Sequence, residues 1–135
     1  MEKIDLQDIL QILIGSLAGA FGFAFTEELH LISENISWSK LALFFIMTLL
    51  FVGLLAYGIG IRKVSRHNIR TLAFIPTRIL LIYGASIVSC IIALWLYDLI
   101  SLQTPIVLIV RKIVVLALPA TAGGTLVDLI GTKNR

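Results

Sequence analysis

The sequence predicts an all-α membrane protein: a bundle of four transmembrane helices that forms a single membrane domain over residues 1–135. Hydrophobic residues make up 59% of the chain and charged residues only 14%, whereas a soluble domain carries about 25% charged residues. Four long apolar stretches each approach the roughly 20 residues that a membrane-spanning helix needs. Short connections between them leave no room for a separate soluble domain.

The first span is predicted over residues 9–29, of which residues 9–26 carry no charge. It contains Gly15, Gly19 and Gly22, and the first two form a Gly-x-x-x-Gly motif. Small residues at this spacing let two helix backbones approach closely in lipid. We expect this stripe to contact another helix of the same bundle or to form a subunit interface.

The second and third spans are predicted over residues 41–61 and 76–97, and Pro76 suits the first turn of a helix. The fourth span, residues 105–130, is the least regular, because Arg111 and Lys112 interrupt it and Pro119 is expected to kink it. In an alternative interpretation, this span starts at Ile113 and residues 104–112 form a re-entrant or interfacial segment. We favour the longer helix.

Basic residues predict the orientation of the chain. Seven of them lie at the two termini and in the loop between the second and third spans, whereas the two opposite loops hold only Lys40. Loops rich in lysine and arginine stay in the cytoplasm. We therefore expect a multi-pass protein of the cell membrane with cytoplasmic N- and C-termini, and with Trp38, Trp95 and Tyr97 near the outer interface.

Several charged residues lie inside or at the edges of these spans. A charge in hydrocarbon costs at least about 2.5–3.5 kcal/mol, so it usually faces a partner or a water-filled cavity. We expect Arg78 to pair with Asp128 near the cytoplasmic side, and Glu27 to pair with Arg111 near the outer side. Lys112 points about 100° away from Arg111 on a helix, and we expect it to snorkel toward the headgroups.

Helical spacing supports these placements. In the fourth span a stripe of small residues ends in a carboxylate, which indicates a buried face, and Arg78 shares a second stripe with Ala85, Ser89 and Ala93. Glu27 falls on the side of Ser16 and Ala20, so it is the better candidate for an inward carboxylate, whereas Glu28 could reach headgroups or a neighbouring subunit. Alternatively, both acids simply end the helix at the outer surface. The fourth-span stripe consists of Ala117, Ala120, Thr121, Gly124 and Asp128.

Several classes of function lack support in the sequence. It contains no Cys/His set with zinc spacing, no glycine-rich phosphate loop and no nucleophile elbow. We therefore expect no enzyme activity, no metal and no cofactor. The net charge of +3 does not indicate nucleic-acid binding, because the basic residues cluster beside the predicted spans. Cys90 lies in an apolar stretch and is expected to be a packing residue.

Two stretches carry a family resemblance. The first span ends in Phe25-Thr26-Glu27-Glu28-Leu29, and the fourth span runs from Arg111 to Asp128 through Pro119-Ala120 and Gly124. Together they resemble a family of integral membrane proteins of unknown function found in archaea and cyanobacteria. The resemblance implies a multi-pass prokaryotic membrane protein with polar residues at these positions in the spans.

These observations lead to two hypotheses about function. In the first, the protein is a homo-oligomeric channel or transporter for protons or small ions, in which Glu27, Arg78, Arg111 and Asp128 line or gate the path. In the second, it is a non-transporting scaffold or accessory subunit whose charged residues form structural salt bridges. In both, the lipid bilayer is its surrounding partner.

Overall fold

The protein is helical in the computed structural model, which describes residues 6–63 and 71–133, with side chains at residues 6–57 and 76–131. No strand occurs in these ranges. Four of the helices are long and apolar enough to cross a membrane, and the nine-residue α2 is not. The predicted all-α class with four spans is thus confirmed. In chain order the helices are α1 (Leu6–Ala24), α2 (Glu27–Asn35), α3 (Trp38–Lys63), α4 (Thr71–Leu96) and α5 (Ile106–Lys133).

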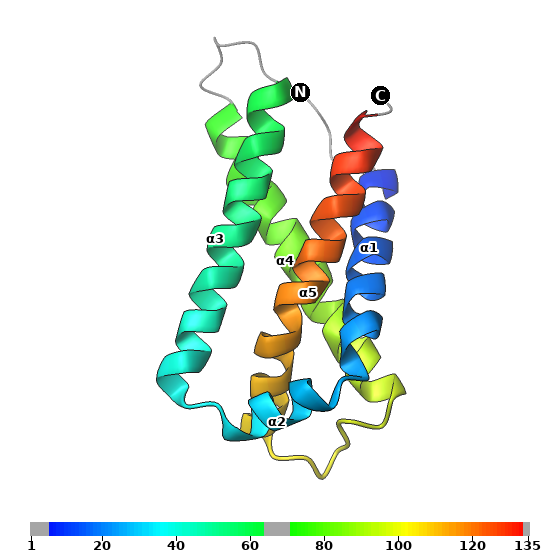
Figure 1. Ribbon diagram of the computed structural model, residues 1–135. Helices are drawn as coiled ribbons and strands as arrows, with labels where there is room; N and C mark the ends of the chain where they lie inside the picture. The colour runs from blue at the N-terminus through cyan, green and yellow to red at the C-terminus, as the bar shows by residue number, and fades with distance from the viewer. Residues whose placement is uncertain (1–5, 64–70, 134–135) are drawn as a thin grey trace.

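Successive long helices run in opposite directions along the bundle (Figure 1). The start of α1, the end of α3, the start of α4 and the end of α5 lie together, and we call this the terminal end. The short helix α2 and the connection between α4 and α5 lie at the opposite end, the α2 end. The start of α1 and the end of α5 therefore lie on the same side of the bundle.

The helix predicted over residues 9–29 ends at Ala24, and a second helix begins at Glu27. The break lies at Thr26, whose backbone is extended (φ −75°, ψ 130°) and whose hydroxyl donates to the carbonyl of Phe23 at 2.9 Å. Glu27 and Glu28 thereby enter the first turn of α2, where the helix dipole favours negative charge. The two acids begin a new helix instead of ending the first span.

The predictions for α4 and α5 have different outcomes. Helix α4 begins at Thr71, five residues before Pro76, so the proline lies inside the helix and not in its first turn. Spanning helices tolerate such prolines because neighbouring helices and local adjustments satisfy the freed backbone groups. Helix α5 is continuous from Ile106 to Lys133 through Arg111 and Lys112, in agreement with the longer of the two helices considered for this span.

The backbones of α1 and α5 approach each other closely at glycine residues. A Cβ atom added to Gly15 would lie 2.5 Å from the carbonyl oxygen of Gly123, and one added to Gly19 would collide with the carbonyl oxygen of Pro119. A Cβ at Gly22 would meet nothing within 4 Å. Gly15 and Gly19 therefore serve a contact within the chain and are not free to form a subunit interface, whereas Gly22 stays open.

Substituting these glycines tests the contact. We expect Gly19→Ala to lower the melting temperature of the detergent-solubilised protein, because a backbone carbonyl cannot move aside without separating α1 from α5. The matched control is Gly22→Ala, which should leave stability unchanged or raise it by up to about 1 kcal/mol, since alanine is the better helix former. Equal melting temperatures for the two variants would contradict this packing.

Candidate functional site

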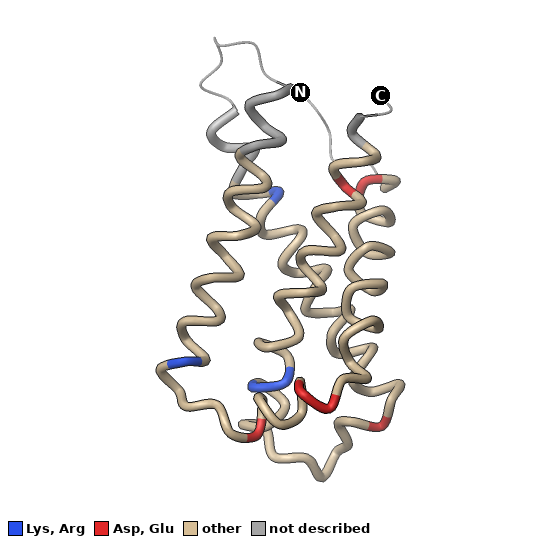
Figure 2. Tube along the Cα trace, in the orientation of Figure 1, with Lys and Arg blue, Asp and Glu red and all other residues tan. Residues whose placement is uncertain are grey.

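The charged residues of the bundle gather toward its two ends. Between these ends the described parts of all four long helices carry no lysine, arginine, aspartate or glutamate (Figure 2). The candidate site therefore consists of two separate polar layers, one at the terminal end and one at the α2 end. Each layer can be built from the helices that hold its side chains.

The layer at the terminal end contains the pair of Arg78 on α4 and Asp128 on α5. Arg78 Nε donates to Asp128 Oδ2 at 2.9 Å, and Nη2 donates to Oδ1, so the contact is bidentate. Asp128 is 1% exposed and Arg78 8%. A bidentate arginine–carboxylate pair is among the strongest hydrogen-bonded contacts in proteins. The structure thus brings together the two residues that we expected to pair here.

The helical stripes expected to be buried hold this pair in place. On α5 the stripe from Ala117 to Asp128 faces the interior throughout, including Ala120 and Gly124. A Cβ added to Gly124 would collide with the hydroxyl of Ser16 on α1. This hydroxyl lies 3.2 Å from that of Ser86, so a polar contact links α1 to α4 beside the glycine of α5. The contact between Ser16 and Ser86 was not predicted from the sequence.

At the α2 end, Arg111 binds the C-terminus of α2. Its Nη1 donates to the carbonyl oxygen of Glu34 at 3.2 Å. This carbonyl lies in the last turn of α2, where carbonyls lack partners within the helix. The guanidinium also lies over the ring of Trp38, 5.1 Å from its centroid, within the range of a cation–π contact. Arg111 therefore ties α5 to the end of α2 and the start of α3.

Lys112 binds beyond the C-terminus of α4 and is buried, with its Nζ donating to the carbonyl oxygen of Leu99 at 2.9 Å. Helix α4 ends in a Schellman motif: Leu99 N–H donates to Leu94, Asp98 N–H donates to Trp95, and Asp98 has φ 58°. A cation is favourable at this end because the helix dipole is negative there. The expectation that Lys112 snorkels outward was wrong, because this side chain is buried and its ammonium donates a hydrogen bond to a backbone carbonyl of the protein.

Glu27 and Glu28 are exposed in the first turn of α2. Arg111 contacts the backbone of Glu34 and the ring of Trp38, and the expected Glu27–Arg111 pair is not formed. The break at Thr26 explains the difference, because it takes Glu27 off the inward face of α1 and places it at the start of another helix. No signal in the sequence identifies the backbone carbonyls of Glu34 and Leu99 as the acceptors.

Other site types find little support in the described part of the chain. It holds no group of three or more histidine, cysteine, aspartate or glutamate residues that could bind a metal ion. Between the two polar layers, Ile12, Val52 and Ile82 are at most 1% exposed and form an apolar cluster. Two open hollows beside α3 have apolar linings.

Charge swaps test the pair at the terminal end. We expect Arg78→Asp and Asp128→Arg each to destabilise the protein by about 3–5 kcal/mol, because each leaves two like charges buried together. The double swap should recover part of this loss, measured by unfolding in detergent. The exposed Lys40→Glu serves as the control and should change little. A double swap that is no more stable than either single swap would contradict a direct interaction.

Comparison with known proteins gives one match. Searches of the curated proteins and of the solved structures found none. The family described as "Putative integral membrane protein (DUF2391)" matches residues 2–130, nearly the whole chain, including all four apolar helices and both polar layers. The chain belongs to this family of integral membrane proteins.

Proposed function

We propose that the protein is a non-transporting membrane scaffold or accessory subunit, in which buried charges fix the arrangement of the helices. One observation carries this proposal: each charge held inside the bundle contacts a group of the protein itself. Arg78 and Asp128 bind each other, while Lys112 binds a backbone carbonyl at the end of a helix. Arg111, at the edge of the bundle, does the same.

The energetics of these contacts favour a structural role. A bidentate, buried ion pair loses several kcal/mol when either partner is removed, because the other charge is left without compensation. An ion that passed between α4 and α5 at the terminal end would have to displace one member of the Arg78–Asp128 pair. It would then have to cross the cluster of Ile12, Val52 and Ile82, which offers no hydrogen-bonding group.

Transport of protons or small ions by a homo-oligomer is the second candidate. It is supported by the buried hydroxyls of Ser16 and Ser86, which meet between three helices and supply polar groups in the core. Four helices rarely enclose a path alone, so this function requires several copies of the chain. Because Gly15 and Gly19 are occupied within the chain, the open face around Gly22 is then the candidate interface.

Flux measurements distinguish the two candidates. The purified protein is reconstituted in liposomes that are loaded with a pH-sensitive dye or an ion indicator. We expect the flux of protons, sodium, potassium and chloride to equal the background flux of protein-free liposomes. Glu27→Gln and Asp128→Asn should leave that background unchanged. Flux above background that Asp128→Asn abolishes would replace the scaffold with a transporter. Asp98→Asn is the matched control, because asparagine also adopts a positive φ readily.

The orientation is part of the same proposal. The four helix ends that lie at the terminal end are the ones that adjoin the basic segments in the sequence. This arrangement supports a cytoplasmic position for the terminal end and a location in the cell membrane. A fluorescent-protein fusion at the C-terminus should therefore fluoresce, and a C-terminal alkaline phosphatase fusion should be inactive. A phosphatase inserted after Gln103, at the α2 end, should be active. The reverse pattern would overturn this orientation.

A further inference from the structure

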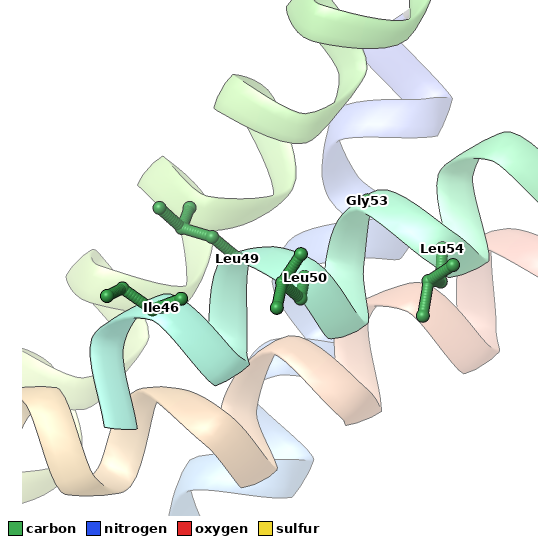
Figure 3. Close-up of a pocket in the computed structure, with 5 residues that line it drawn as sticks. All are labelled: Ile46, Leu49, Leu50, Gly53 and Leu54. Atoms are coloured by element: carbon green, nitrogen blue, oxygen red, sulfur yellow. The ribbon is translucent and has the colours of Figure 1, made fainter. Parts of the chain in front are cut away.

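An apolar groove runs along α3 from Trp38 to Leu54. It consists of two open hollows that share Ile46, and we call it the α3 groove. Sixteen residue steps at about 1.5 Å give it a length of roughly 24 Å. The first hollow, about 320 Å³, is lined by Trp38, Leu41, Ala42, Phe45 and Ile46 of α3 and by Val114 of α5. The second, about 450 Å³, is lined by Ile46, Leu49, Leu50, Gly53 and Leu54 (Figure 3).

The guanidinium of Arg111 lies at the end of this groove. Arg111 stacks on Trp38, the first residue of the lining. Its Nη1 has the Glu34 carbonyl as acceptor, and its Nε is buried without a hydrogen-bond partner. In the described part of the chain, no carboxylate lies within ion-pair distance of Arg111. No carboxylate of the described chain therefore pairs with this guanidinium, which has donors still unused beside an otherwise apolar surface.

We infer that the α3 groove binds an anionic phospholipid, with the headgroup at Arg111 and one acyl chain along α3. Arginine suits phosphate because its planar donors match the oxygens. Trp38 is the first residue of a candidate span, the depth at which tryptophan meets the headgroups. One leaflet of hydrocarbon is about 15 Å thick. A chain that starts beside Trp38 would therefore fill the first hollow and reach the second.

The cation at the end of the groove favours an anionic lipid over an apolar partner helix. Such a helix would cover the apolar side chains of α3 but would carry no anion for Arg111, whereas a phosphate group supplies one.

Tryptophan fluorescence tests the site, because the chain holds only Trp38 and Trp95. In the Trp95→Phe variant, Trp38 is the sole reporter. The protein is reconstituted in phosphatidylcholine vesicles. One set contains a fraction of brominated phosphatidylglycerol, and the other contains the same fraction of brominated phosphatidylcholine. Brominated acyl chains quench tryptophan fluorescence at short range. We expect the quenching of Trp38 to show that phosphatidylglycerol binds about fivefold more strongly than phosphatidylcholine. This factor corresponds to the roughly 1 kcal/mol that one cation near the surface contributes.

Three comparisons make the result specific. Arg111→Gln should remove the preference. Ala42→Phe, which fills the first hollow and keeps Arg111, should remove it as well, whereas Leu43→Phe should keep it because Leu43 lies outside both linings. In the Trp38→Phe variant, Trp95 at the end of α4 should show no preference. Circular dichroism and gel filtration show whether each variant is folded.

Three outcomes would overturn the inference. The first is equal quenching of Trp38 by the two brominated lipids. The second is the same preference at Trp95 as at Trp38, which would show general enrichment of anionic lipid near this end. The third is a preference that persists in both Arg111→Gln and Ala42→Phe. Because Ala42→Phe does not alter the guanidinium, the inference stays testable even if Arg111→Gln does not fold.

Discussion

Arg78 and Asp128 can remain inside the bundle because each gives the other an opposite charge and a hydrogen-bond partner, which hydrocarbon cannot provide. Both nitrogens of the bidentate contact are directed at a carboxylate on another helix, so the pair sets how α4 and α5 align at the terminal end. The small residues along α5 then bring α1 against the same helix, through Gly15 and Gly123. Helix α5 is thus the central element, and the charged pair determines its register.

The same physical rule accounts for the α2 end, where the acceptors are backbone carbonyls. The last carbonyls of a helix lack partners within it, and in an apolar environment they need donors from elsewhere. Two adjacent cations on α5 point in different directions, so Arg111 reaches the end of α2 and Lys112 the end of α4. This explains how two consecutive basic residues fit into an otherwise apolar span. It also shows why their presence does not by itself indicate an ion path.

Helix α3 carries many exposed apolar side chains, among them Leu43, Leu50 and Leu54. The one charged residue among its described side chains, Lys40, is exposed at the α2 end. The surface of α3 is therefore available to lipid or to another membrane protein, as a scaffold or accessory subunit requires. A bound anionic lipid would cover part of this face and connect the Arg111 contact to the packing of α3.

The sequence alone determined the four spans, the buried stripes and the expectation that Arg78 meets Asp128, because apolar length and helical spacing depend only on the order of residues. It could not show that Thr26 breaks the first helix, since a short polar stretch is compatible with either a continuous or an interrupted helix. Tertiary structure alone decided the partners of Arg111 and Lys112. Their acceptors are main-chain carbonyls, which every residue carries, and only the way helix ends meet in space determines which of them a cation can reach.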